Sequence, residues 1–273
     1  QKILKLCKRK QIKIISDNAI NFGLKKSDIF FGKESDFSFY SLNYQKNLSS
    51  ILGGIVHCKN KKDFLKINKI KSDVEYPTFK VVKLILFINI LNLFFKNKFF
   101  YNYFTFILLK NFFYKSKIFL KIMYPNYRNK IKTKITENYN WNYNYKLSYF
   151  GLKSINDFNR TNKHRIKISH IYQKIFNKYD FINDLMAGSH SVKLEYAVII
   201  RNKLKNKLAN FLLTKGYDIR TYWYSNNSNK KFKNSSYLEK NILCFPTHDL
   251  IDKKYLDQLD QNLNEFNSKI AKY

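Results

Sequence analysis

Two side chains near the start of the sequence could together act on an aldehyde cofactor. Asp17 offers a carboxylate, and Lys46, 29 positions further on, offers a primary amine. A lysine amine can attack an aldehyde to form an imine, and a carboxylate can keep a pyridine nitrogen protonated so that the ring withdraws electrons. This pair of residue types therefore predicts imine chemistry in a cofactor crevice.

Both residues follow apolar runs that predict β-strands. Ile12, Ile14 and Ile15 form a β-branched run that ends at Asp17, and the stretch DFSFYSL precedes the loop that carries Lys46. The interval between the two runs has room for one crossover connection. Ligands of open α/β sheets bind outside the carboxyl ends of the strands. We therefore expect an α/β fold in which the acid and the amine lie just beyond two strand ends.

The same residues resemble a known family. The stretch is similar to the core of the DegT/StrS-type sugar aminotransferases, which depend on pyridoxal phosphate and have the fold-type I architecture. That family has an acid in a D-x-A motif followed by a glycine, and a serine five positions before the cofactor lysine, which precedes a Gly-Gly strand. The matching positions are Asp17, Ala19, Gly23, Ser41, Lys46, Gly53 and Gly54.

The resemblance implies a role for each residue. Lys46 would form the internal aldimine with pyridoxal 5'-phosphate and then carry the proton between cofactor and substrate, while Asp17 would keep the pyridine nitrogen protonated. Ala19 would lie under the ring, and Ser41 would hydrogen-bond the phosphate. Asn144, in the segment NYNYKLS, resembles a family asparagine that reaches the phosphate of the neighbouring subunit. A homodimer with a shared active site follows from that role.

The sequence also departs from the family pattern. Ile20 stands where the family usually has Gln or His near the phenolic oxygen of the cofactor, and Lys146 stands where Arg is common. Relatives have a large part of the cofactor domain, with a phosphate cradle and a stacked aromatic ring, before the point that corresponds to Gln1. The chain therefore resembles the C-terminal portion of such an enzyme, and either it is a fragment or the other portion is on another chain.

Composition raises a different class of function. The formal net charge of +32 would suit binding to nucleic acid or to an anionic membrane. The lysines are spread along the chain, and the over-used residues are those of A/T-rich codons, so we interpret most of the charge as genome bias and expect no nucleic-acid partner. The three cysteines form no C-x-x-C motif, which favours a reducing, cytoplasmic location, and the scattered histidines indicate no metal site.

We expect two domains. Residues 1–140 would be the C-terminal part of the large cofactor domain, with a hydrophobic helical insertion at about 75–135, and residues 141–273 would be a small α/β domain. The apolar runs at 81–95 and 99–114 are divided by lysines and are too short to span a membrane, so paired buried helices are expected there. Peripheral contact of 81–114 with a membrane is the alternative.

In the second domain, the spacing of apolar residues predicts helices at 154–176 and 201–216 and strands at 194–200 and 217–224. It also predicts a last helix with an apolar stripe of Tyr255, Leu259, Leu263 and Phe266. Arg220 and Tyr222 could touch a substrate, and His248 is interpreted as a turn residue.

The sequence thus predicts a transaminase that moves an amino group from glutamate to a keto group of a nucleotide-linked deoxysugar, for lipopolysaccharide, capsule or glycan biosynthesis. A non-catalytic or truncated remnant of the family is one alternative, and it would show no cofactor absorbance. A basic peripheral membrane or nucleic-acid-binding protein is the other, and its binding would weaken steeply with salt.

Overall fold

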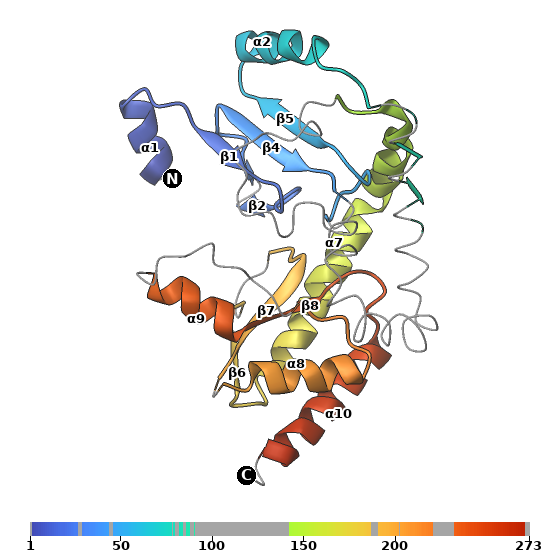
Figure 1. The fold of residues 1–273 in the computed structure, drawn as a ribbon. Coiled ribbons are helices and arrows are strands. Elements are labelled where there is room, and N and C mark those ends of the chain that lie inside the picture. Colours follow the sequence, from blue (N-terminus) through green and yellow to red (C-terminus); the bar gives the residue numbers. More distant parts are fainter. Residues whose placement is uncertain are drawn as a thin grey trace. The chain divides into compact units, whose positions relative to one another are not determined.

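The chain divides into two compact units, Gln1–Ile155 and Asn156–Tyr273. The predicted domain boundary after residue 140 lies outside the described residues, as does most of the predicted insertion at about 75–135. The computed structural model describes residues 2–26, 29–43, 46–77, 142–186, 191–201, 203–220 and 232–270, together with positions 79, 82, 83, 86, 87 and 90 (Figure 1).

Unit 1 is built around a three-stranded sheet. Its elements are α1 (Lys2–Arg9), β1 (Ile15–Asp17), β2 (Lys25–Lys26), β3 (Ile29–Phe30), β4 (Phe37–Ser41), β5 (Gly54–Cys58), α2 (Lys61–Ser72), the 3-10 helix η4 (Tyr145–Leu147) and the start of α7 (Ser148–Phe176). In the sheet, β4 lies between β1 and β5 (Figure 1).

The strand directions agree with the open α/β pattern. β1 pairs with β4 in parallel, with Asp17 opposite Phe39, and β5 pairs with β4 antiparallel. The two predicted strands and the predicted Gly-Gly strand are therefore confirmed. The crossover between β1 and β4 contains the small antiparallel pair β2–β3, which was not predicted from the sequence.

The crossover covers one face of this sheet. Ser38 is fully buried there, and its hydroxyl donates to the carbonyl oxygen of Gly32 at 2.6 Å. The hydroxyl of Tyr40 donates to Phe31 O at 2.9 Å. Because side chains alternate along a strand, Asp17 and Ser41 lie on the opposite face. That face also carries Phe39, whose side chain is 39% exposed.

An aspartate at the end of the crossover fixes the start of β1. Asp36 Oδ2 accepts from the backbone N–H of Ile14 at 2.8 Å, and its Oδ1 accepts from Lys13 Nζ at 3.2 Å. Lys13 Nζ also lies 3.4 Å from Asp63 in the first turn of α2. The Ile14 hydrogen bond above all, and then the Lys13 ammonium, hold the pKa of Asp36 below its ordinary 3.8, while partial burial opposes the shift.

Helix α2 is a surface helix. The Asn60 side chain caps it by accepting from Asp63 N, and it has no buried residue. Phe64 and Leu65, two of its apolar residues, are about half exposed. No helix in the described part of the chain is long and apolar enough to cross a membrane. The runs expected to form buried or membrane-contacting helices, 81–95 and 99–114, lie almost wholly outside the described residues.

Unit 2 contains the larger core. Its elements after α7 are β6 (Ile182–Asp184), β7 (Glu195–Ile200), α8 (Lys205–Thr214), α9 (Lys233–Asn241), β8 (Ile242–Pro246) and α10 (Lys253–Ile270). The strands form an antiparallel sheet in the order β6-β7-β8. The predicted helices and the strand at 194–200 are confirmed. Of the strand predicted at 217–224, Arg220 pairs with Cys244 in an isolated bridge, and 221–224 lie outside the described residues.

Aromatic packing joins α7 to this sheet. The ring of Tyr172 stacks on Phe176 with centroids 5.3 Å apart, and both rings contact Tyr196 and Phe245. The Tyr172 hydroxyl donates to Pro246 O at 2.8 Å, and burial raises its pKa well above 10.0. Ile155, near the start of the predicted 154–176 helix, is 55% exposed.

The Asp36 contacts predict a pH-dependent stability for unit 1. Because the folded pKa of Asp36 lies below the unfolded value, its contribution is present above about pH 4 and is lost as the pH falls through the folded pKa. We expect Asp36→Asn to cost up to about 1 kcal/mol at neutral pH, since the group is partly exposed. Thermal unfolding of both proteins from pH 7 to pH 2 measures this, and an equal difference at every pH would contradict it.

Candidate active site

Asp17 and Ser41 lie at the same end of the sheet because β1 and β4 run in parallel. Asp17 is the last residue of β1 and Ser41 the last of β4, and the register places Ser41 two positions beyond the partner of Asp17. Neighbouring strands are about 4.8 Å apart. The predicted acid and the predicted phosphate ligand are therefore diagonal neighbours on one sheet face.

The turn after β1 orients the acid. Asp17 Oδ1 accepts from Ala19 N at 3.0 Å, and the buried Asn18 donates its backbone N–H to Phe39 O at 2.9 Å. The Asp17 side chain is exposed and Ala19 is half-buried. Gly23, at φ 75°, adopts the left-handed conformation that favours glycine and turns the chain into the crossover.

The loop that carries Lys46 is closed by backbone hydrogen bonds. Leu42 N donates to Gly53 O, and Ser50 N donates to Leu42 O, both at 2.9 Å. Inside the loop, Lys46 N donates to Asn43 O at 2.9 Å. The Leu48 side chain is 1% exposed and anchors the loop, while Lys46 itself is half-buried. The amine is thus carried by a closed loop that begins where β4 ends.

A side chain that was not predicted from the sequence as a site residue connects the two loops. Asn47, next to Lys46, is 6% exposed, and its Nδ2 donates to Phe22 O at 2.8 Å. Phe22 lies in the turn that follows Asp17, and its ring packs edge-on against Tyr40 at 5.3 Å. Only the position of Asn47 between Lys46 and the apolar Leu48 could have drawn attention to it in the sequence.

Asn144 belongs to the same unit as Asp17 and Lys46. Its Oδ1 accepts from Lys146 N at 3.0 Å and so caps η4. The preceding residue, Tyr143, packs its ring against Gly53. The cap uses the amide oxygen of Asn144, and the amide nitrogen is the donor that a phosphate would need. The predicted contact with a neighbouring subunit stays a prediction.

These residues fit a pyridoxal phosphate group chemically. The carboxylate of Asp17 suits a protonated ring nitrogen, the amine of Lys46 suits an aldehyde, and the hydroxyl of Ser41 can donate to a phosphate. The buried Oδ1 of Asn43, in the loop that carries Lys46, has no hydrogen-bond partner, as expected where a polar ligand or water belongs. Ile20, at the family's Gln or His position, is 57% exposed and offers no polar group.

Polar residues of unit 2 are engaged in its own structure. Arg165 is buried, and its Nη1 donates to Thr247 Oγ1 at 2.8 Å, while desolvation lowers its pKa. Arg220, a predicted substrate contact, pairs with Glu195 at 2.7 Å. The carbonyl of His248 accepts from Ile251 N at 3.0 Å, which agrees with its interpretation as a turn residue. No cluster of three potential metal ligands occurs among the residues that the structure describes.

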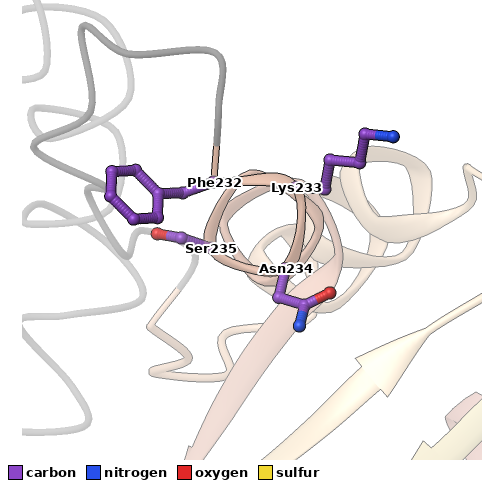
Figure 2. Close-up of a pocket in the computed structure, with 4 residues that line it drawn as sticks. All are labelled: Phe232, Lys233, Asn234 and Ser235. Atoms are coloured by element: carbon purple, nitrogen blue, oxygen red, sulfur yellow. The ribbon is translucent and has the colours of Figure 1, made fainter.

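A surface pocket in unit 2 does not coincide with the predicted site. It lies at the start of α9 and is lined by Phe232, Lys233, Asn234 and Ser235. Figure 2 shows that these side chains spread in different directions from the first helical turn. Ligand sites usually have polar groups that converge, so this pocket is not assigned a ligand.

Comparisons with known proteins give a likeness in fold. No protein-family model matches the sequence, and no curated protein is similar to it in sequence. Among solved structures, Helicobacter pylori PseC, an aminotransferase involved in the biosynthesis of pseudoaminic acid, is 13% identical with a TM-score of 0.65, and the match covers 98% of this chain and 62% of that one.

Two further structures agree. A DegT DnrJ EryC1 StrS aminotransferase from Brucella abortus is 15% identical with a TM-score of 0.62, over 97% of this chain and 60% of that one. Spr1654 from Streptococcus pneumoniae, named as a sugar aminotransferase and solved in its PLP form, is 15% identical with a TM-score of 0.61, over 95% and 58%. The chain thus spans about 60% of the length of these structures.

The fold is therefore that of the pyridoxal-phosphate-dependent aminotransferases, and the α/β fold class predicted from the sequence is confirmed. Of these structures, the one from Brucella abortus is named as a DegT DnrJ EryC1 StrS aminotransferase, the family that the sequence resembles, and Spr1654 is named as a sugar aminotransferase.

The packing at Gly53 generates a second prediction. Gly53 has φ 117°, and a Cβ atom there would lie 2.6 Å from the Tyr143 ring. We expect Gly53→Ala to destabilise unit 1 by about 2 kcal/mol or more, from backbone strain and overpacking together. Thermal unfolding measures the loss.

The double variant Gly53→Ala/Tyr143→Ala separates the two causes, because removing the ring leaves only the backbone strain. If the free energy of unfolding lost in the double variant equals the sum of the losses in the two single variants, the ring contact contributes nothing.

Proposed function

We propose that the protein is a pyridoxal-phosphate-dependent sugar aminotransferase, and that this chain supplies its cofactor lysine, its ring-nitrogen acid and its small domain. The observation that carries the proposal is the parallel pairing of β1 with β4. This pairing sets Asp17 and Ser41 side by side, and the Lys46 loop follows directly. The fold of known sugar aminotransferases supports the same conclusion.

The cofactor, when bound, supplies an electron-withdrawing ring that stabilises negative charge on the substrate carbon. Asp17 holds the ring nitrogen protonated, and its strand-end position keeps the carboxylate in a fixed direction. Lys46 would hold the cofactor through its Nζ amine, and the same amine would accept a proton from the substrate carbon and return it. Ser41 and Asn144 donate hydrogen bonds to the phosphate, and Ala19 leaves room for the ring.

We propose glutamate as the amino donor and a keto group of a nucleotide-linked deoxysugar as the acceptor, with the product used in lipopolysaccharide, capsule or glycan biosynthesis. We further propose a cytoplasmic homodimer, since Asn144 would serve the neighbouring subunit. The resemblance of the sequence to the family supports these finer points.

Attachment of the cofactor to Lys46 tests the proposed function. The complete polypeptide that carries this sequence would be incubated with pyridoxal phosphate, reduced with borohydride and mapped by mass spectrometry. We expect saturable modification of Lys46, no visible cofactor band in Lys46→Ala, and a fall in transamination of about 100-fold or more, because the proton carrier is lost.

Lys62→Ala is the matched control, since Lys62 is an exposed lysine of α2. It should label and react like the parent. Modification of surface lysines with no preference for Lys46 would refute the proposed function.

The Ile20 position gives a further prediction. Ile20→Gln would introduce an amide donor where the family has one, and we expect Lys46 to become half-modified at a lower pyridoxal phosphate concentration. Because Ile20 is largely exposed, stability should change by no more than about 0.5 kcal/mol. An unchanged half-saturating concentration would show that the missing phenolic-oxygen contact is supplied by another residue.

A further inference from the structure

Asn47 is an unusual residue for its position in the Lys46 loop. Its neighbour Leu48 is fully buried, and Leu42 at the other side of the loop is also buried. Asn47 is also buried, at 6% exposure, although it carries a carboxamide. Burying an amide costs free energy unless its hydrogen bonds are made, so an apolar residue would stabilise the loop as well if anchoring were its only task.

The hydrogen bond of Asn47 leaves the loop. Its Nδ2 donates at 2.8 Å to the carbonyl oxygen of Phe22, which lies 25 residues earlier in the chain. Phe22 is part of the turn between Asp17 and Gly23, where Asn21 N and Leu24 N form the local backbone hydrogen bonds. The bond therefore joins the turn that orients the acid directly to the residue beside the amine.

The other half of the carboxamide is also informative. With Nδ2 directed at a carbonyl oxygen, Oδ1 is the remaining polar atom, and it is buried without a hydrogen-bond partner. Retaining an unsatisfied acceptor carries a further cost. A buried asparagine with one unsatisfied acceptor and one long-range hydrogen bond is expected where that hydrogen bond controls the position of one loop relative to another.

We propose that Asn47 is a positioning residue that holds the Lys46 loop in register with the Asp17 turn, so that the amine meets a cofactor aldehyde whose ring nitrogen is held by Asp17. The inference rests on the proposed function, because it assigns the register of the two loops to the assembly of the cofactor site. Asn47 acts through Lys46 and needs no contact with the cofactor itself.

The alternative is that Asn47 only stabilises the loop. Positioning predicts a lower limiting rate of Lys46 modification by pyridoxal phosphate, with little change in the half-saturating concentration, because phosphate and ring ligands are untouched. A purely structural role predicts lower thermal stability, with an unchanged limiting rate in the folded protein.

The test compares Asn47→Asp and Asn47→Ala with the parent in the complete polypeptide. Asp is nearly isosteric but lacks the donor, and Ala removes the whole group. We expect the limiting rate of borohydride-trapped Lys46 modification to fall about tenfold in both, as expected for one lost hydrogen bond of this type. We also expect faster amide hydrogen exchange at residues 18–24, which requires no cofactor.

Ser49→Ala is the control from the same loop. Ser49 Oγ accepts from Ile51 N at 3.1 Å, so this variant loses a hydrogen bond inside the loop but keeps the bridge to Phe22. It should modify Lys46 at the parental rate and leave exchange at 18–24 unchanged.

The outcomes separate the two proposals. If pyridoxal phosphate modifies Lys46 selectively in the parent, and at the same limiting rate in the Asn47 variants, the positioning role is wrong while the proposed function stands. If exchange at 18–24 is unchanged in both variants, the bridge is not present in solution and the inference is overturned. If the parent itself shows no preference for Lys46, the proposed function fails and the positioning role fails with it.

Discussion

The parallel pairing of β1 with β4 is the constraint on which the candidate site depends. Two strands that run in the same direction end at the same edge, so residues that follow them meet although a crossover separates them in sequence. The register decides which face they share, because a slip of one residue would turn Asp17 to the face that the crossover covers. The hydrogen bond from Ile14 N to Asp36 fixes that register where β1 begins.

Segments distant in sequence complete the surroundings of the Lys46 loop. The Tyr143 ring packs on Gly53, and Ser49 N donates to the Ser154 hydroxyl in α7 at 3.0 Å. Both contacts join residues roughly a hundred positions apart, so the loop is held by residues that follow position 141 in the sequence. The Lys46 loop is therefore supported from its start at β4, from the Asp17 turn and from the beginning of α7.

Much of this arrangement could be predicted from sequence, because burial and turns leave local patterns. The β-branched run before Asp17 and the Gly-Gly strand predicted the sheet, and periodic leucines predicted α8 and α10. The Phe22 bridge could not be predicted, since the partner of a side-chain amide is set by tertiary packing. For the same reason the role of Asn144 as a cap of η4 and the hairpin inside the crossover left no distinct sequence signal. The exposure of Phe64 likewise depends on what packs beside α2, not on its helical spacing.

The net positive charge determines how strongly anions are attracted, whereas the candidate site determines which anion is bound. A net charge of +32 attracts pyridoxal phosphate, nucleotide sugars and nucleic acid alike, because long-range fields act on charge and are screened beyond about 8 Å at physiological salt. Discrimination among such anions requires donors and acceptors at hydrogen-bond distance. Asp17 is informative here, because a carboxylate beside Ser41 at the sheet edge would repel a polyanion, whereas a ligand with a protonated ring nitrogen needs such a carboxylate. At this position the negative charge of Asp17 therefore favours a cofactor with a protonated ring nitrogen over a nucleic-acid backbone.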